Sequence, residues 1–127
     1  MKESMRILIA ETDPKIVTQL NYYLASFGHK VLPVVTTGED LMKHVELLNP
    51  SLIITDINLN GQLDGVEAIA RLQSSYNIPY IFITANDDYS SLIYSYNLNP
   101  VSIIKKPVDQ NNLYESVEKA QLHLELA

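Results

Sequence analysis

Five short runs of apolar residues alternate along this chain with longer stretches in which apolar residues recur at helical spacing. The runs lie at residues 6–10, 31–35, 51–55, 80–83 and 101–104. A short run that is apolar at consecutive positions is typical of a strand buried on both faces of a sheet. Because strands that alternate with helices are joined by crossovers, the pattern predicts an α/β fold in which helices cover both faces of one parallel sheet.

The stretches between the runs carry the signals of helix ends. Helices are expected over residues 14–27, 37–48, about 64–74, about 87–97 and from 110 towards the end of the chain. A carboxylate before a helix accepts the free N–H groups of its first turn, and the expected N-caps of this kind are Asp13, Asp64 and Asp109. The apolar spacing predicts that Tyr96 and Leu124 face the core, and the three histidines are expected at the surface.

The order of the strands follows from how apolar each run is. The first, third and fourth runs are the most continuously apolar, which places them in the middle of the sheet. The second run contains Pro33, which has no N–H to donate, so this strand belongs at an edge. The order 2-1-3-4-5 with right-handed crossovers satisfies both conditions. The expected fold is therefore a flavodoxin-like, doubly wound five-stranded parallel sheet.

Composition limits both the domain count and the classes of function. The 127 residues are enough for one domain, and 46% hydrophobic residues with 19% charged residues is typical of a globular chain. The net charge of −6 argues against direct binding to nucleic acid or to an anionic membrane, because both need a basic patch. The chain has no cysteine and no signal-like start, so a cytoplasmic protein without disulfides is expected.

Polar residues follow four of the five predicted strands where each strand ends. They are Glu11 after the first, Asp56 and Asn58 after the third, Thr84 after the fourth and Lys106 after the fifth. In a parallel sheet of this order these strand ends meet, so the side chains are expected to share one solvent-open site. Clustered carboxylates favour a cation between them, and a small set of oxygen ligands suits Mg²⁺. The neighbouring hydroxyl and ammonium would suit a phosphoryl group.

Four segments in this order resemble the receiver domain of two-component response regulators. They are Ile-Leu-Ile-Ala-Glu at 7–11, Asp-Ile-Asn-Leu at 56–59 with Asp-Gly at 64–65, Thr-Ala at 84–85 and Lys-Pro at 106–107. Each segment alone is a weak signal. Four segments in the right order, each after a predicted strand, make a strong one. The resemblance covers essentially the whole chain and implies a single receiver domain over residues 1–127, with no effector domain in this chain.

The resemblance also implies a role for each residue of the site. Asp56 would accept a phosphoryl group from the phosphohistidine of a sensor histidine kinase or a phosphotransfer protein. Glu11, Asp56 and the backbone carbonyl of Asn58 would hold Mg²⁺, while Thr84 and Lys106 would contact the phosphoryl oxygens. Such a domain is regulatory rather than an enzyme, although it assists its own phosphorylation and dephosphorylation. It passes the signal to a downstream protein, which the sequence does not identify.

The chain departs from the family pattern at three places. Thr12 stands where the family usually has a second acid, which predicts weak Mg²⁺ binding. The loop after Asp56 lacks the common proline and is one residue longer than the commonest form. Ile103 occupies the position of the switch aromatic, so a switch here would act through aliphatic packing. The output surface is expected on the fourth helix, fifth strand and fifth helix, with Tyr94, Ile103 and Tyr114 as candidate contacts, and a homodimer could form through it.

Three other classes of function compete with this interpretation. A pseudo-receiver, which keeps the fold and binds partners without phosphorylation, is supported by Thr12. A flavodoxin-like nucleotide binder would need small residues after the first strand to bind phosphate, where this chain has Glu-Thr-Asp-Pro at 11–14. An aspartyl-phosphate hydrolase would have its nucleophile after the first strand. The retention of Asp56, Thr84 and Lys106 together favours the phosphoryl-accepting receiver.

Overall fold

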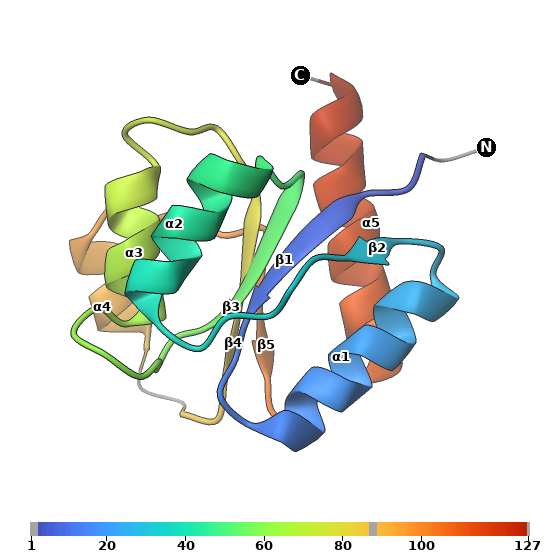
Figure 1. Cartoon of the computed structure of the whole chain (residues 1–127), viewed down its shortest axis with the longest axis horizontal. Coiled ribbons are helices and arrows are strands. Elements are labelled where there is room, and N and C mark those ends of the chain that lie inside the picture. The colour runs from blue at the N-terminus through green and yellow to red at the C-terminus, as the bar shows by residue number, and fades with distance from the viewer. Residues whose placement is uncertain (1–2, 87–88, 127) are drawn as a thin grey trace.

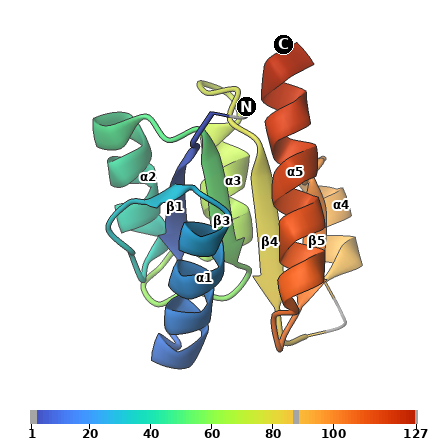
Figure 2. The ribbon, with the colours of Figure 1, turned by 90° about the vertical axis from the view of Figure 1, so that its right-hand side faces the viewer.

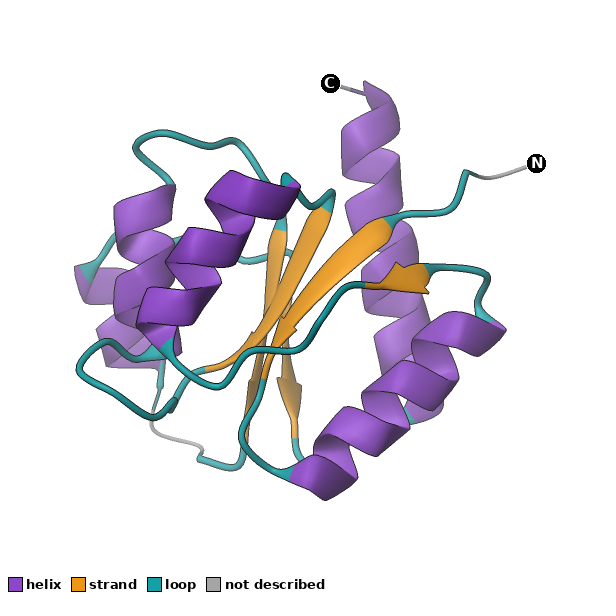
Figure 3. Ribbon diagram, in the orientation of Figure 1, coloured by secondary structure: helices purple, strands orange, loops and turns teal. Residues whose placement is uncertain are grey.

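The computed structural model describes residues 3–86 and 89–126. In this part of the chain five parallel strands form one sheet in the order β2-β1-β3-β4-β5 (Figure 1). The strands are β1 (Arg6–Ala10), β2 (Lys30–Val31), β3 (Leu52–Asp56), β4 (Tyr80–Thr84) and β5 (Ser102–Lys105). The helices are α1 (Pro14–Ser26), α2 (Gly38–Leu48), α3 (Gly65–Leu72), α4 (Ser90–Ser95) and α5 (Gln110–Leu126). The predicted α/β class and strand order are confirmed (Figure 3).

Helices cover both faces of the sheet, so the central strands are buried on both sides. α1 and α5 lie on one face, and α2, α3 and α4 lie on the other (Figures 1 and 2). Along β1, Ile7 and Ile9 belong to the core under α1 and α5, whereas Leu8 and Ala10 belong to the core under the other three helices. All four are fully buried. Because neither face meets water, the strand is apolar at every one of these positions.

The second strand is shorter than predicted. It spans Lys30–Val31 at the edge of the sheet, because Pro33 has no N–H to continue the ladder. The chain nevertheless stays beside β1, where Val35 forms an isolated bridge with Ala10. The N–H of Val35 donates to the carbonyl of Ile9 at 3.0 Å. The proline therefore interrupts the edge strand without detaching it.

Helix ends differ from the predicted boundaries at α3 and α4. α3 ends at Leu72, and α4 spans only Ser90–Ser95. The expected start of α4 near Asp87 lies outside the described residues. The predicted N-caps are confirmed, since each carboxylate accepts a first-turn N–H at 2.8–3.0 Å: Asp13, Asp64 and Asp109. Within residues 3–86 and 89–126, every helix is too short or too polar to cross a membrane.

Three side chains lie elsewhere than predicted. Tyr96 and Leu124 are 39% and 36% exposed rather than in the core. For Leu124 the reason is that α5 extends past the end of the sheet (Figure 2). His29 is buried rather than at the surface, and its Nδ1 accepts the N–H of Met5 at 3.0 Å. The imidazole thus satisfies a backbone donor just before β1.

Candidate functional site

The strand register brings the predicted site residues to one edge of the sheet. β1 and β3 are paired so that Glu11, which follows β1, and Asp56, which ends β3, lie on neighbouring strands at the same level. Thr84 ends β4, which pairs with both β3 and β5, and Lys106 follows β5 directly. In Figure 1 this is the lower edge, towards which the strand arrows point. The predicted convergence at the carboxyl ends of the strands is therefore observed.

The ammonium of Lys106 lies between the two acids. Its Nζ donates a hydrogen bond to Asp56 Oδ2 at 2.6 Å and lies 2.9 Å from Glu11 Oε1. The side chains of Glu11 and Asp56 are 0% and 9% exposed, and that of Lys106 is 16% exposed. The site is therefore more closed than the solvent-open site that was expected, because the lysine covers both carboxylates.

The surroundings raise the pKa of Lys106 above its usual value. Burial lowers the pKa of the ammonium, but the close contacts with the carboxylates of Asp56 and Glu11, and their negative charges, together raise it by more. Lys106 is therefore charged at neutral pH. It acts as a fixed internal counter-ion to two carboxylates that would otherwise repel each other.

Each carboxylate uses its other oxygen to hold the loop that follows its strand. Glu11 Oε2 accepts the N–H groups of Thr12 and Asp13, both at 2.9 Å. Asp56 Oδ1 accepts the N–H of Asn58 at 3.1 Å. Glu11 Oε1 is buried without a hydrogen-bond partner, although the Lys106 ammonium is 2.9 Å away. That contact is an ion pair that lacks the alignment of a hydrogen bond, so this oxygen keeps capacity for another cation.

Thr84 lies beside this cluster, but its hydroxyl is bonded to the loop after β4. The residue is fully buried. Its Oγ1 accepts the N–H of Asn86 at 3.0 Å and donates to the Asn86 carbonyl at 3.3 Å. The Thr84 carbonyl accepts the N–H of Lys106 at 2.8 Å. This backbone bond fixes the start of the Lys106 side chain next to the end of β4.

The site offers two carboxylates to a metal ion. Within the described ranges, no group of three or more His, Cys, Asp or Glu side chains is arranged to hold a metal. Asp13 caps α1 instead of turning towards the site, and Thr12 is exposed. Mg²⁺ commonly takes only one or two carboxylates and completes its shell with water and phosphate oxygens. Glu11, whose buried Oε1 has no hydrogen-bond partner, Asp56 and the Asn58 carbonyl therefore fit Mg²⁺.

One residue of this region was missed by sequence reasoning. Glu39, in the first turn of α2, accepts the N–H of Leu63 at 2.8 Å from the loop that joins β3 to α3. An acid in a first turn is an ordinary feature of a helix. The sequence therefore gave no signal that this one binds a different segment.

Residues 7–118 match the family model of the response regulator receiver domain. The chain belongs to this family. This receiver domain is 30% identical over 91% of its length to the positive alginate biosynthesis regulatory protein of Pseudomonas aeruginosa, of which it covers 47%. It is 30% identical over 90% of its length to the phyllosphere-induced regulator PhyR of Methylorubrum extorquens, of which it covers 42%. The chain thus spans about half the length of the curated relatives it matches.

A solved structure agrees with the fold. The signal receiver domain of a modulated diguanylate cyclase from Desulfovibrio desulfuricans is 35% identical, with a TM-score of 0.88 and 98% of each chain covered. Family membership confirms the resemblance that the four sequence segments carried. Receiver domains are regulatory parts of two-component systems that work with histidine kinases or phosphotransfer proteins, and they generally bind Mg²⁺. The roles of the individual site residues in this receiver domain stay predictions.

Proposed function

We propose that this receiver domain accepts a phosphoryl group on Asp56 from the phosphohistidine of a sensor histidine kinase or a phosphotransfer protein. The observation that carries the proposal is the Lys106 ammonium, which lies 2.6 Å from Asp56 and 2.9 Å from Glu11 at the carboxyl edge of the sheet. A carboxylate beside a fixed cation is suited to attack phosphorus, because the positive charge is already in place to stabilise the negative charge of the phosphoryl oxygens in the transition state.

In the transfer step, one oxygen of Asp56 attacks phosphorus in line with the leaving imidazole nitrogen. A P–O bond forms, the P–N bond breaks, and the electron pair of the P–N bond leaves with the imidazole. After transfer, the Lys106 ammonium would pair with the phosphoryl oxygens. The Thr84 hydroxyl would break its hydrogen bonds to Asn86 and bond to one of these oxygens. The domain positions groups and neutralises charge for its own phosphorylation and dephosphorylation, so it is a regulatory phosphoacceptor rather than an enzyme.

Glu11, Asp56 and the Asn58 carbonyl would hold Mg²⁺. When bound, the ion would supply positive charge to the phosphoryl oxygens. Thr12 is exposed and brings no charge where the family usually has a second acid, so we expect weak binding. The side chain that could replace this acid, Asp13, is engaged as the cap of α1.

The output surface would be formed by α4, β5 and α5. Tyr94 is 87% exposed on α4 and Tyr114 is 45% exposed on α5. Ile103 on β5 is half-buried and packs against the core under α2, α3 and α4. A change near Thr84 would reach this surface through β5, which pairs with β4. We propose that this surface binds a downstream protein in the cytoplasm. The same elements could also form a homodimer interface.

The second candidate function is a pseudo-receiver that binds partners without phosphorylation, and the exposed Thr12 favours it. Incubation with acetyl phosphate and Mg²⁺, followed by intact-mass measurement, separates the two functions. The phosphoacceptor should gain one phosphoryl group. Asp56→Asn should gain none, and Asp40→Asn, which removes an exposed acid of α2, should behave as the wild type. Wild type without any gain would favour the pseudo-receiver, and uptake by Asp56→Asn would move the acceptor elsewhere.

A further inference from the structure

The loop between β3 and α3, residues 57–64, is held against α2 by the side chain of Glu39. Its Oε1 accepts the N–H of Leu63 at 2.8 Å, and its Oε2 accepts the N–H of Gln62 at 3.4 Å. The carboxylate also lies against Gly61, where a Cβ would come within 2.6 Å of Oε2. Two consecutive backbone donors of the loop therefore depend on one carboxylate from a different element.

Backbone contacts complete the junction between this loop and α2. The N–H of Asn60 donates to the Thr36 carbonyl at 3.1 Å, and the N–H of Gly38 donates to the Leu63 carbonyl at 3.2 Å. A Cβ on Gly38 would lie 2.5 Å from the Leu63 carbonyl oxygen, so the close approach requires glycine. Gly61 has φ +86°, a conformation that side chains disfavour. The loop is thus shaped to meet α2 along its whole tip.

The charge of Glu39 suits this contact. Its pKa is lowered, chiefly by the hydrogen bond from Leu63, which outweighs the effect of burial, and further by Gln62 and Arg71. The side chain is therefore a carboxylate at neutral pH. An ionised acceptor makes stronger hydrogen bonds to N–H groups than a neutral one does.

The other end of the loop is joined to the phosphoacceptor. The N–H of Asn58 donates to Asp56 Oδ1 at 3.1 Å. The N–H of Gly65 donates to the Ile57 carbonyl at 2.9 Å, which closes the base of the loop. With its tip bound to α2 and its base closed, the loop holds the Asn58 backbone in one place. Without Glu39, the loop would keep its base and the backbone bonds to Thr36 and Gly38, but the N–H groups of Gln62 and Leu63 would lose their acceptor.

We propose that Glu39 is a positioning residue, which orders the loop so that Asn58 and Asp56 Oδ1 are held ready for Mg²⁺ and the phosphoryl group. The inference rests on the proposed function, since it assigns Glu39 a part in the same reaction. Removing Glu39 lowers the fraction of molecules with an ordered loop, and the apparent affinity of a ligand falls in proportion to that fraction. The effect falls on the Mg²⁺ concentration required and not on the rate at saturation.

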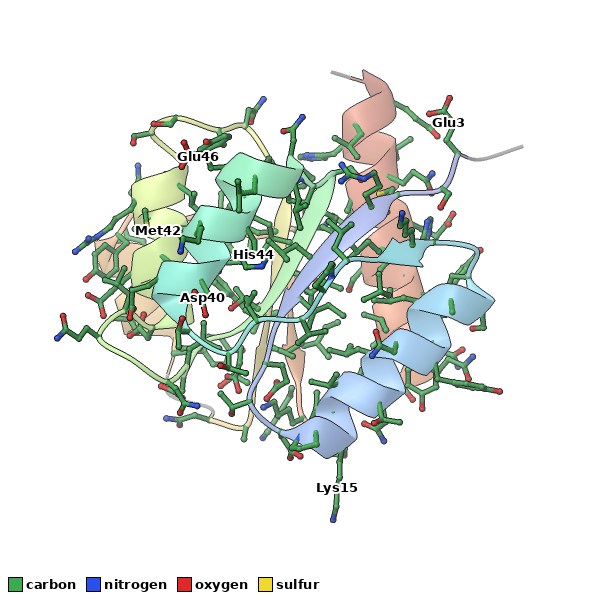
Figure 4. The ribbon with its side chains drawn as sticks, viewed as in Figure 1. Glu3, Lys15, Asp40, Met42, His44 and Glu46 are labelled. Carbon is green, nitrogen blue, oxygen red and sulfur yellow. The ribbon has the colours of Figure 1, made fainter. Side chains whose placement is uncertain are left out.

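The experiment compares Glu39→Ala and Glu39→Gln with the matched control Asp40→Asn. Asp40 is exposed in the same first turn of α2 (Figure 4), so the control removes one negative charge there and keeps the Glu39 bonds to the loop. The first measurement is amide hydrogen exchange at Gln62 and Leu63, without Mg²⁺ or phosphate donor. The second is the initial rate of phosphorylation by acetyl phosphate across a Mg²⁺ titration. Thermal unfolding establishes that each variant is folded.

We expect Glu39→Ala to exchange faster at both amides and to raise the half-saturating Mg²⁺ concentration roughly tenfold, with a similar rate at saturation. Glu39→Gln keeps one acceptor oxygen but loses the charge. Its exchange rates and its half-saturating Mg²⁺ concentration should therefore lie between those of Glu39→Ala and those of the wild type. Wild-type exchange in Glu39→Ala would overturn the inference, and so would faster exchange with an unchanged Mg²⁺ requirement. A wild-type protein that takes up no phosphoryl group at any Mg²⁺ concentration would overturn the proposed function itself, and with it the part of Glu39.

Discussion

Lys106→Met tests whether the two acids of the site depend on one ammonium. The Nζ atom lies 2.6 Å from Asp56 and 2.9 Å from Glu11, whose side chains are 9% and 0% exposed. Methionine keeps a flexible chain of similar length but carries no charge. The substitution therefore leaves two carboxylates in a poorly solvated place with no cation between them.

The size of the effect follows from this burial. Removing one partner of a buried ion pair costs about 3–5 kcal/mol. The Lys106 side chain is 16% exposed, and because water screens part of its charge we expect the lower end, about 3 kcal/mol. For a domain of this size, such a loss lowers Tm by about 10 °C.

The stabilisation also has a defined pH range. The pKa of Lys106 is higher in the folded state than its ordinary value of 10.5. The contribution of the charged ammonium is therefore fully present below pH 10.5 and is lost as the pH rises through the folded-state pKa. The difference in Tm between the wild type and Lys106→Met should be the same at pH 7 and at about pH 9, and it should shrink above 10.5.

Thermal unfolding followed by circular dichroism in low-salt buffer measures this difference. Lys15→Met is the matched control, because Lys15 is exposed and points away from the domain (Figure 4). Adding Mg²⁺ should recover part of the lost Tm in Lys106→Met, since a divalent cation can take over the role of counter-ion. If Lys106→Met unfolds within about 3 °C of Lys15→Met, a difference below about 1 kcal/mol, the acids do not depend on Lys106 and the reasoning is refuted.

Three further predictions concern the backbone, the switch and the metal. A Cβ on Gly65 would overlap the Asp56 carbonyl oxygen, so Gly65→Ala should lose about 2 kcal/mol or more in urea denaturation, and an unchanged midpoint would contradict the packing. Adding beryllofluoride, a phosphoryl mimic, should shift amide signals of Tyr94 and Ile103, and shifts limited to the loops around Asp56 would argue against a propagated switch. Thr12→Asp should tighten Mg²⁺ binding in a titration by restoring a charge, and no tightening would place Thr12 away from the metal.

The fold and the centre of the site could be predicted because both depend on repeating local patterns. A strand buried on both faces reads as a continuous apolar run, and parallel strands bring their carboxyl ends to one edge. Glu11 and Asp56 directly follow such a run, and Lys106 comes two residues after the end of one. Their convergence therefore needed only the strand order, which Pro33 helped to define by marking an edge.

The features that were missed depend on contacts between distant segments. His29 is buried because the N–H of Met5 needs an acceptor, and neither residue signals the other. Leu124 has apolar spacing but belongs to the last turn of α5, a helix that extends past the sheet (Figure 1). Glu39 looks like an ordinary first-turn acid until the loop after β3 is placed beside it. Periodicity reports which face of an element is apolar, but not where a neighbouring element ends.

The arrangement of the site gives two separate reasons to expect weak Mg²⁺ binding. The first is the missing charge at Thr12, and the second is that Lys106 already lies between Glu11 Oε1 and Asp56 Oδ2. Mg²⁺ has to displace the ammonium from these oxygens or share them with it. Thr12→Asp addresses the first cause and Lys106→Met the second, so each should lower the half-saturating Mg²⁺ concentration. If the causes are independent, the free-energy gains should add in the double variant. A double variant that binds no tighter than Thr12→Asp would show that Lys106 does not compete with the metal.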